Sequence, residues 1–419
     1  MRVLVISTLF PPNVIGGAEI SAWNLARWLK SQGHEVGVVT TANLPGEAED
    51  DVVDKDGLRV WRIWMPRRYA AANHIDRPKP QKMLWHLQDH LDPRNRRLVE
   101  KVIDAFQPEF VNIHLLAGIG FNILSSLAKR DLPVMFALHD LAVICLRSSM
   151  FKEGRECRTR CATCIASSWW KQHLIAKVRR LGFYSPSSAN LETVEAHFPL
   201  HRYLTLVAPN PNRYPEPTVT SAPSEKVRFL YVGRIHPTKG VETLLAAADS
   251  LAERHDFSLT IVGEGPSAAG LRNSYGDRSW VHFTGRVPQE EVSNWMVASD
   301  VLCIPSIWAE NSPGVAINAL NCRLAILGSN KGGIPELVHH EDNGLLVEAG
   351  DVPAWAKAME RLIEDRQGLE TMRENAAQRA TAFHPATLAE KLYRFMLSIA
   401  ELPEGASERA SAKVAITGR

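Results

Sequence analysis

The chain has 419 residues, of which 45% are hydrophobic and 22% charged, and its formal net charge is +2. These totals are typical of a globular protein with room for two hydrophobic cores, and they exclude a disordered chain. No window of about 18 apolar residues occurs, which excludes a membrane-spanning helix. The short apolar start MRVLVIS resembles a buried strand more than a signal peptide. We therefore expect a cytoplasmic protein.

Charge is divided unevenly along the chain. Residues 1–215 hold 28 Lys and Arg against 20 Asp and Glu, whereas the remainder holds 20 against 26. The positive excess concentrates in residues 59–101, with 11 basic and 4 acidic side chains, and in residues 147–180, with 9 and 2. Such segments favour an anionic membrane surface or a phosphorylated acceptor as partner, and we expect no nucleic acid. Basic faces without a partner are also common, so that alternative stays open.

Strand and helix patterns alternate in the first half of the chain, and the alternation begins again in the second half. The first-half segments are RVLVIS, AEISAWNLARWLKSQ, EVGVVT, FVNIH, FNILSSLAKR and PVMFAL. The second-half segments are VRFLYVG, KGVETLLAAADSLAER, FSLTIVGEG, WVHFTG, DVLCIP, LAILGS and NGLLVEAG. This alternation predicts parallel sheets covered by helices. The expected fold class is α/β, with two tandem Rossmann-like doubly wound domains and a ligand cleft between them.

A proline-rich loop at residues 208–226 separates the two halves and sets the domain boundaries. We expect an N-terminal Rossmann-like domain at 1–212 that binds the acceptor, a linker at 213–226 and a C-terminal Rossmann-like domain at 227–384. An amphipathic helix at 385–402 is expected to cross back to the N-terminal domain, and 403–419 to form a loose tail.

In the first domain, two glycines and a histidine follow predicted strands. Gly16 and Gly17 lie in PPNVIGGAE between the first strand and the first helix, where they permit close backbone approach to a ligand or form a simple tight turn. His139 precedes Asp140 at the end of the strand PVMFAL. A histidine there can donate a hydrogen bond to a sugar hydroxyl or a phosphate, although an isolated histidine is more often structural.

Two cations in YVGRIHPTKG, residues 231–240, follow the first strand of the second domain. Arg234 and Lys239 lie five residues apart across a turn and open a helix, where positive charge opposes the helix dipole. A diphosphate would explain them, because Arg grips two oxygens at once and Lys supplies a point charge. Gly263 lies in a second glycine turn, IVGEGP, which lacks the spacing of a dinucleotide fingerprint.

The stretch SIWAENSPGVAINALNC, residues 306–322, predicts a helix N-terminus beside a carboxylate. Ser312 is the expected N-cap and Pro313 the first helical residue, which leaves the N–H groups of Gly314 and Val315 free for an anion. Glu310 lies just before this helix. Asn318 is expected on the face opposite an apolar stripe.

Taken together, the stretches PPxxxGGAE, GHEVxVVT, HD after a strand, VGRxxxxKG, IVGxGP, FxGxV, AENSP and GGIPELV resemble glycosyltransferase family 4, of the GT-B fold. The resemblance covers nearly the whole chain. It implies a retaining enzyme that moves a sugar from a nucleotide diphosphate sugar and needs no catalytic metal. It further implies that Arg234 and Lys239 grip the diphosphate and that Glu310 touches the donor sugar. The family's second acid, which usually holds the ribose hydroxyls, is Asn318 here.

We expect further contacts near the same pocket. Gly332 and Gly333 are candidates to line it, and Val287, just after FTGR, is a candidate contact of the base. An amide at position 318 still bonds a hydroxyl but forgoes a charge-assisted bond, worth about 1 kcal/mol or more. Donor affinity is then expected to be weaker, or the donor different.

Four of the six cysteines lie within 20 residues: Cys145, Cys157, Cys161 and Cys164. The spacing C-x11-C-x3-C-x2-C is loose for zinc, but a tetrahedral structural zinc would pin this irregular basic stretch. Reduced cysteines without a ligand are the alternative, since disulfides are rare in the cytoplasm. The following SSWWKQHLIAKVRRLGF, residues 167–183, combines tryptophans with basic residues. This combination is typical of a helix at a membrane surface, and a core helix with a solvated basic face explains it as well.

The sequence therefore predicts a cytoplasmic retaining glycosyltransferase, metal-independent and hexosyltransferase-like. It would use a nucleotide diphosphate sugar and a glycan or lipid-linked acceptor, in surface polysaccharide or glycolipid assembly, with peripheral association to the inner face of a membrane. One alternative is a catalytically degenerate family member that binds a nucleotide sugar or a partner. A second is a Rossmann-type dinucleotide-binding oxidoreductase, which fits poorly because no G-x-G-x-x-G follows the first strand.

Overall fold

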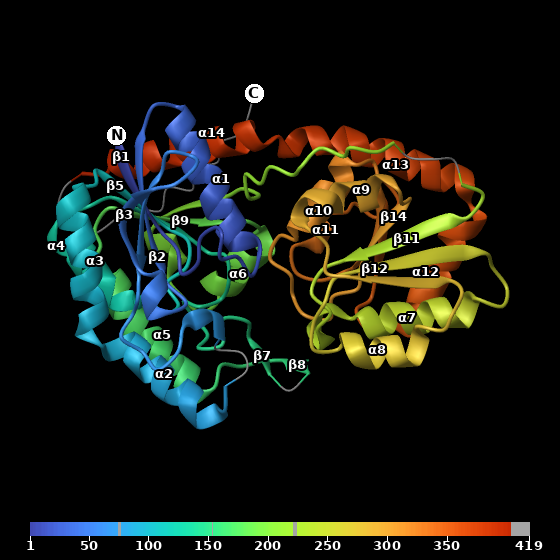
Figure 1. Cartoon of the computed structure of the whole chain (residues 1–419), viewed down its shortest axis with the longest axis horizontal. Helices are drawn as coiled ribbons and strands as arrows, with labels where there is room; N and C mark the ends of the chain where they lie inside the picture. The colour runs from blue at the N-terminus through green and yellow to red at the C-terminus, as the bar shows by residue number, and fades with distance from the viewer. Residues whose placement is uncertain (74–76, 153, 221–223, 404–419) are drawn as a thin grey trace. The chain divides into compact units, whose positions relative to one another are not determined.

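The computed structural model describes residues 1–73, 77–152, 154–220 and 224–403. Two compact units make up the chain (Figure 1). Unit 1 comprises Met1–Met150, Cys157–Asn212 and the segment that begins at Pro385, whereas unit 2 comprises Phe151–Glu156 and Arg213–His384. Most of the expected tail and three residues of the expected linker lie outside the described residues.

Unit 1 is built on a sheet in the order β10-β9-β6-β5-β1-β2-β4-β3. All neighbouring strands pair in parallel except β3 and β4, which are antiparallel. The strands are β1 (Arg2–Ile6), β2 (Glu35–Thr41), β3 (Glu49–Val53), β4 (Arg59–Ile63), β5 (Phe110–Ile113), β6 (Val134–Ala137), β9 (Leu181–Ser185) and β10 (Leu204–Val207).

Helices cover both faces of this sheet. They are α1 (Gly17–Ser31), α2 (Lys79–Leu91), α3 (Pro93–Phe106), α4 (Leu124–Lys129), α5 (Ala162–Ile175), α6 (Ser188–Glu195) and α14 (Pro385–Ala400), with short 3-10 turns at Pro45–Glu47, Ala71–Asn73, Phe121–Ile123 and Leu200–Arg202. Side chains of β1 alternate between the two cores: Val3 and Val5 face the core that α1 and α14 complete, and Leu4 faces the one containing α3, α4 and α5. The sheet is thus buried on both sides, as a parallel sheet requires.

Unit 2 contains a six-stranded, fully parallel sheet in the order β13-β12-β11-β14-β15-β16. Its strands are β11 (Val227–Val232), β12 (Phe257–Val262), β13 (Val281–Gly285), β14 (Val301–Ile304), β15 (Ala325–Ser329) and β16 (Gly344–Val347). A separate two-stranded sheet joins β7 (Phe151–Lys152) to β8 (Arg155–Glu156). The strand order changes direction between β11 and β14, which is where ligands bind in open α/β sheets.

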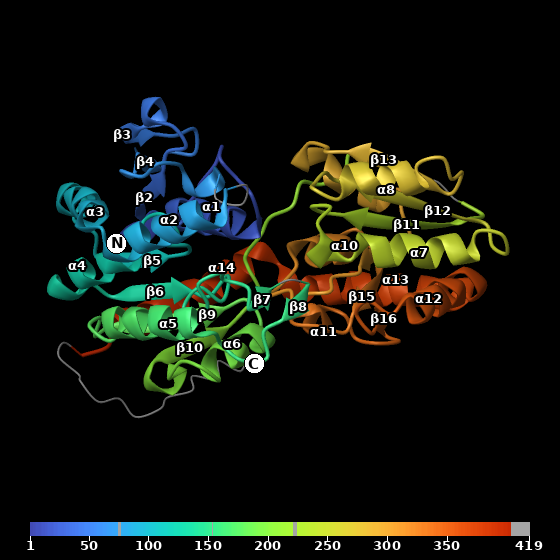
Figure 2. The same ribbon diagram turned by 90° about the horizontal axis from the view of Figure 1, so that it is seen from below.

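The helices of unit 2 are α7 (Val241–Leu251), α8 (Ala268–Tyr275), α9 (Val292–Val297), α10 (Gly314–Asn321), α11 (Ile334–Leu337), α12 (Val352–Glu364) and α13 (Arg366–Ala380), with 3-10 turns at Pro237–Lys239, Gln289–Glu291 and Thr381–Phe383. Figure 2 shows α7 along the sheet of this unit and α12 and α13 beside it. Trp355 of α12 is the largest fully buried side chain in this core. Phe229 of β11 is also fully buried there.

Several elements were not expected from the sequence, among them α2, α3, the edge strand β3 and its neighbour β4. Prolines at positions 78, 80 and 93 stand at the starts of the two helices, where they are tolerated but hide the helical pattern. No helix in the described part of the chain is long and apolar enough to cross a membrane.

Candidate functional site

The loops that follow β11 and β14 meet at the carboxyl edge of the unit 2 sheet. These strands are parallel neighbours, with Phe229 opposite Val301, so their carboxyl ends lie side by side. The backbone N–H of Ile307 donates to the Thr238 carbonyl at 2.9 Å. A Cβ built at Gly240 would lie 1.9 Å from the Pro305 carbonyl oxygen, and Gly240 has a positive φ of 66°. Only glycine lets the two loops approach this closely.

Glu310 is the center of this junction. Its Oε1 accepts hydrogen bonds from Lys239 Nζ and Ser306 Oγ, both at 2.6 Å, and from Trp308 Nε1 at 2.9 Å. Burial raises the pKa of this carboxyl, but the Lys239 charge and the hydrogen bonds outweigh burial and leave the pKa below its usual 4.5. Glu310 is therefore ionised at neutral pH, and a carboxylate has lone pairs left to accept from a sugar hydroxyl.

Lys239 lies at the end of the 3-10 turn that Pro237 opens, and its ammonium also lies 5.2 Å from the center of the Trp308 ring. The ion pair with Glu310 uses one of its three N–H donors, so two remain for another anion. Arg234 is exposed, and among the described residues no carboxylate pairs with it. Its carbonyl oxygen accepts from Tyr231 Oη at 2.9 Å, which fixes the backbone of the turn. The guanidinium is thus available for an external anion.

His236 and Trp308 belong to this site, although sequence reasoning did not name them. His236 Nδ1 accepts from the Thr238 backbone N–H at 3.2 Å, so its proton in the neutral ring is on Nε2. Burial lowers the pKa of His236, and the nearby Arg234 and Lys239 charges lower it further. His236 lies in the motif around Arg234, and Trp308 lies in the motif around Glu310. Their place within these motifs could have identified them from the sequence.

The helix α10 begins at Gly314, and Pro313 is its N-cap. The prediction of Ser312 as N-cap was wrong: its hydroxyl is buried with no hydrogen-bond partner among the described residues. Pro313 has extended ψ of 107°, so the helical turn starts one residue later than expected. The first N–H groups of the helix, at Gly314 and Val315, have no side-chain cap. Their use as an anion site stays a prediction.

Asn318 is buried within unit 2, and its side chain faces α9. Its amide group is within 3.4 Å of Ser293 Oγ, and only 3% of the residue is exposed. The face of α10 opposite the apolar stripe is therefore buried at Asn318 as well. Because neighbouring helices cover α10, the residues from Ala316 to Leu320 are all buried.

Three of the predicted glycines have roles within the protein. A Cβ at Gly332 would lie 2.3 Å from the Glu310 carbonyl oxygen, and Gly333 donates its N–H to that oxygen at 2.7 Å. These two glycines hold the Glu310 loop. A Cβ at Gly263 would lie 1.9 Å from the Gly233 carbonyl oxygen, so Gly263 lets the turns after β11 and β12 pack together. Val287 is half-buried just after β13, two strands from β11.

In unit 1, the turn before α1 is closed by a buried acid. Glu19 Oε2 accepts from the Gly16 N–H at 3.0 Å, and burial raises the pKa of Glu19. Apart from its chain neighbours and the backbone of its own helix, no atom of the described residues lies within 4 Å of a Cβ built at Gly17. Internal packing therefore does not require glycine at position 17. The sequence analysis did not name Glu19, which fixes this turn.

His139 follows β6, and its Nε2 lies 2.7 Å from Nδ1 of His114, which follows the neighbouring strand β5. Asn112 Nδ2 lies 2.9 Å from the other nitrogen of His114. Burial lowers the pKa of His139 to about 3. His139 is therefore a neutral imidazole at pH 7, which exchanges hydrogen bonds but brings no positive charge.

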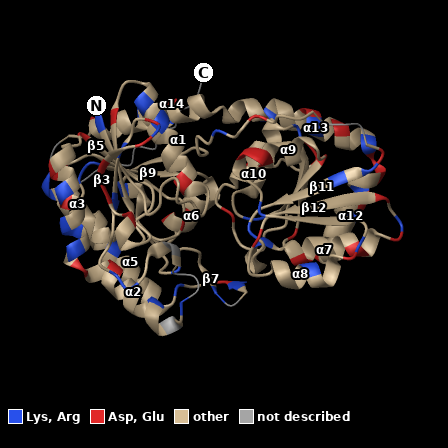
Figure 3. Cartoon of the chain, viewed as in Figure 1, with Lys and Arg blue, Asp and Glu red and all other residues tan. Residues whose placement is uncertain are grey.

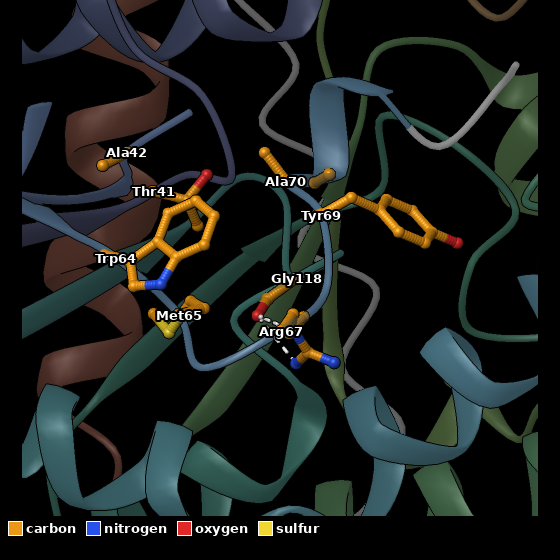
Figure 4. Close-up of a pocket in the computed structure, with 9 residues that line it drawn as sticks. Thr41, Ala42, Trp64, Met65, Arg67, Tyr69, Ala70 and Gly118 are labelled. Atoms are coloured by element: carbon orange, nitrogen blue, oxygen red, sulfur yellow. Dashed lines mark hydrogen bonds between the residues drawn. The ribbon is translucent and has the colours of Figure 1, made fainter. Parts of the chain in front are cut away.

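A small recess in unit 1 lies apart from these residues (Figure 4). Thr41, Trp64, Met65, Tyr69 and Gly118 line it together with Arg67. Arg67 donates to the Gly118 carbonyl at 2.8 Å and pairs with buried Asp89 at 2.8 Å. The guanidinium is thus committed to internal partners.

The four clustered cysteines are free thiols in the structure. The sulfurs of Cys145 and Cys164 lie 3.9 Å apart. Within the described residues, the one group of three ligating side chains with all ligating atoms within 4.8 Å of one another is His255, Glu360 and Glu364. Arg254 already pairs with Glu360 at 2.8 Å.

Comparison with known proteins agrees with this architecture. A family model described as "Glycosyl transferase 4-like domain" matches residues 16–191, and one described as "Glycosyl transferases group 1" matches residues 215–379. D-inositol 3-phosphate glycosyltransferase of Corynebacterium diphtheriae is 28% identical, over 94% of this chain and 93% of its own.

Two solved structures share the fold. Sucrose-phosphate synthase of Thermosynechococcus elongatus has a TM-score of 0.74 at 21% identity, covering 95% of this chain and 99% of its own. HepE of Anabaena, in complex with UDP-glucose, has a TM-score of 0.67 at 17% identity, covering 95% and 100%. The fold and the matching models define a glycosyltransferase of GT-B type, which confirms the predicted fold class. Within that class, the chain belongs to glycosyltransferase family 4.

Proposed function

We propose that this glycosyltransferase transfers a sugar from a nucleotide diphosphate sugar with retention of configuration and without a catalytic metal. The observation that supports the proposal most is the junction at the carboxyl edge of the unit 2 sheet. There, an ionised Glu310, two cations and the uncapped start of α10 follow neighbouring strands. The structure of HepE was solved with UDP-glucose, which is consistent with a nucleotide sugar as donor here.

The diphosphate would bind to Arg234, to the two remaining donors of Lys239 and to the N–H groups of Gly314 and Val315. Negative charge grows on the leaving diphosphate as the sugar bond breaks, and preorganised donors stabilise that charge in the transition state. Glu310 would accept hydrogen bonds from the sugar hydroxyls. Lys239 pairs with Glu310. If Lys239 also binds the leaving diphosphate, the sugar and the diphosphate would be held in one geometry.

On the acceptor side, unit 1 would contribute the Gly16–Gly17 turn and His139. A neutral imidazole can donate to a sugar hydroxyl or a phosphate oxygen without the cost of a buried charge. The open space at Gly17 would let a ligand approach the backbone. Asn318 and Val287 stay proposed contacts of the nucleoside. In the structure, the Asn318 amide packs against Ser293 of α9.

The test is calorimetric titration of the full chain with UDP, GDP and ADP, without added metal and with a chelator present. We expect one nucleotide to bind, and Arg234→Ala to weaken its affinity about 10- to 100-fold, because a charge-assisted hydrogen bond is lost. Arg254→Ala is the matched control, since Arg254 is an exposed arginine of the same unit that pairs with Glu360. Equal affinity in all three proteins would refute the diphosphate site.

A product assay separates the enzyme from a catalytically degenerate relative. The active protein should release the nucleoside diphosphate from the matching nucleotide sugar, slowly to water and faster with an acceptor. The anomeric configuration of the product, read by NMR, tests retention. Tight nucleotide binding without any release of diphosphate would favour the degenerate relative.

We further propose a lipid-linked or polysaccharide acceptor, approached at an anionic membrane surface. Met83, Leu87 and Leu91 recur every four residues along α2 and are 74%, 55% and 57% exposed. On α5, Ile165 and Trp169 are 50% and 67% exposed. Hydrogen bonds hold α5 against α2, since Trp170 Nε1 donates to the His90 carbonyl at 3.3 Å.

Figure 3 shows Lys and Arg along α3 and near α2 and α5. Exposed apolar side chains among basic ones suit the interface of an anionic bilayer, where apolar burial and charge attraction add. The other occupant of such a face would be a protein partner.

Vesicle flotation tests the membrane surface. The chain should float with vesicles of phosphatidylglycerol and much less with phosphatidylcholine alone. A double Leu87→Ser, Trp169→Ser variant should lose most of the binding. Leu44→Ser, at a residue 58% exposed elsewhere in unit 1, should keep it. Absence of flotation with anionic vesicles would contradict a membrane role.

A further inference from the structure

The cysteine cluster in unit 1 has no part in the proposed transfer reaction. Cys145 lies in the loop after β6 and Cys164 in the first turn of α5, and both are buried. Cys161 is the exposed N-cap residue of α5. Its sulfur lies 3.1 Å from the Thr163 hydroxyl. Cys161 and Cys164 are three residues apart at the start of α5, a spacing that places side chains on one side of a helix.

The segment that these cysteines join has little regular structure. Between the end of β6 at Ala137 and the start of α5 at Ala162, the described residues contain two strands of two residues each, and no helix. A few backbone hydrogen bonds fold the segment, among them Leu141 N–H to the Ser148 carbonyl at 2.9 Å and Cys157 N–H to the Met150 carbonyl at 2.7 Å. A segment with so few internal bonds gains stability from a cross-link.

The distances at the buried pair suit a tetrahedral thiolate site. Zn–S bonds of about 2.3 Å imply sulfurs about 3.8 Å apart in a tetrahedron. The Cys145 and Cys164 sulfurs are 3.9 Å apart, and their side chains need no movement to match. The Leu146 N–H donates to the Cys164 sulfur at 3.4 Å. Such an N–H donor from outside the ligand set orients a ligating sulfur and stabilises its negative charge.

A buried cation lies beside the same pair. Lys171 of α5 is 4% exposed, and its ammonium donates to the Ala142 carbonyl at 2.6 Å. It lies close enough to Cys145 and Cys164 for its charge to interact with both sulfurs, and with the acids Asp140 and Asp89. Zinc bound by several thiolates carries net negative charge, which a neighbouring ammonium would offset.

We propose that Cys145, Cys161 and Cys164 hold a structural Zn²⁺, with Cys157 as the fourth ligand, and that the metal fixes the segment between β6 and α5. Within the described residues no three of these sulfurs lie within 4.8 Å of one another. Zinc binding therefore requires the Cys161 sulfur to move toward the other two sulfurs. The exposed Cys161 side chain can do so by rotation about its Cα–Cβ bond. Cys157, four residues earlier, follows with its loop. Each bound thiol releases its proton to solvent as the Zn–S bond forms.

The first measurement is the zinc content of the full chain, produced in zinc-supplemented medium and purified with a reductant but no chelator. Elemental analysis should find about one zinc per chain. A mercurial reagent that captures thiolates should release the metal to a metallochromic dye, which needs no variant. Cys164→Ser should lose the zinc. Cys322→Ser, a half-buried cysteine of unit 2, should retain it.

Replacement of zinc by Co²⁺ adds a second readout, because thiolate ligands give an intense near-ultraviolet charge-transfer absorption. That band should appear in the wild type and in Cys322→Ser. Two results would overturn the proposal. One is a folded chain that contains no zinc after production in zinc-supplemented medium and purification without a chelator. The other is a chain without zinc in which mild oxidation by a disulfide reagent links Cys164 to Cys161 or Cys145, which would assign a redox pair.

Discussion

At the scale of single residues, Glu310 combines burial with ionisation. It is 9% exposed, and three donors bond the same carboxylate oxygen. The family resemblance implied that Glu310 and Lys239 serve one site. It could not predict their 2.6 Å ion pair, since that contact depends on the packing of the Gly240 and Pro305 backbones.

Glu310→Gln tests this arrangement through the pH dependence of stability. The folded-state pKa of Glu310 is below its usual 4.5, so its contribution is present above that pH and is lost as pH falls through the folded-state pKa. We expect the variant to lose about 1–3 kcal/mol of unfolding free energy at pH 7. The difference between the two proteins should shrink in urea titrations as pH falls through the folded-state pKa of Glu310.

The exposed Glu348→Gln serves as the control for that substitution and should change little at any pH. A stability difference between wild type and Glu310→Gln that stays constant from neutral to acidic pH would show that the carboxylate charge does not stabilise the fold.

At the scale of elements, α10 shows how a neighbouring helix changes the meaning of a sequence pattern. The apolar positions of residues 315–320 predicted one buried face, but burial extends from Ala316 to Leu320. The cause is α9, whose Ser293 covers the polar side chain of Asn318. The pattern of polar and apolar residues in one helix shows which face is apolar. It does not show how many other helices pack against that helix.

Asn318→Glu should therefore destabilise unit 2. A carboxylate at this position would lie beside the Ser293 hydroxyl with no cation described nearby, and burying a poorly compensated charge costs about 1–3 kcal/mol or more. The melting temperature, measured by circular dichroism, should fall by several degrees.

Asn321→Glu provides the matched comparison, because Asn321 is exposed on the same helix. Its cost should stay below about 1 kcal/mol, which is the effect of a negative charge near a helix C-terminus. If Asn318→Glu proved as stable as wild type and bound nucleotide more tightly, position 318 would face the ribose, as the family resemblance implies.

At the scale of the whole molecule, α14 completes the core of unit 1 although it follows unit 2 in the chain. Leu392, Phe395 and Ile399 are fully buried against the sheet. A Cβ at Gly182 of β9 would lie 2.5 Å from a terminal carbon of Ile399, so this strand has glycine where the helix crosses it. Unit 1 is thus assembled from segments nearly 400 residues apart.

Leu392→Ala should destabilise unit 1 by about 2–5 kcal/mol, because it removes apolar contacts and leaves a cavity. Leu397→Ala, on the same helix but 38% exposed, should cost much less. Chemical denaturation monitored by tryptophan fluorescence would compare the two. Equal stability of both variants would mean that α14 does not contribute to the core of unit 1.

The sequence by itself determined the α/β class, the tandem arrangement of two doubly wound sheets and the family. Strand and helix periodicity is local, and motifs such as VGRxxxxKG occupy short stretches of chain. Tertiary structure decided the start of α10, the burial of Asn318, the partners of Glu310 and the pairing of the Cys145 and Cys164 sulfurs. The Lys239–Glu310 pair, the Ser293–Asn318 contact and the Cys145–Cys164 contact join residues 71, 25 and 19 positions apart. A local pattern carries no record of which side chains the fold will bring within hydrogen-bonding distance.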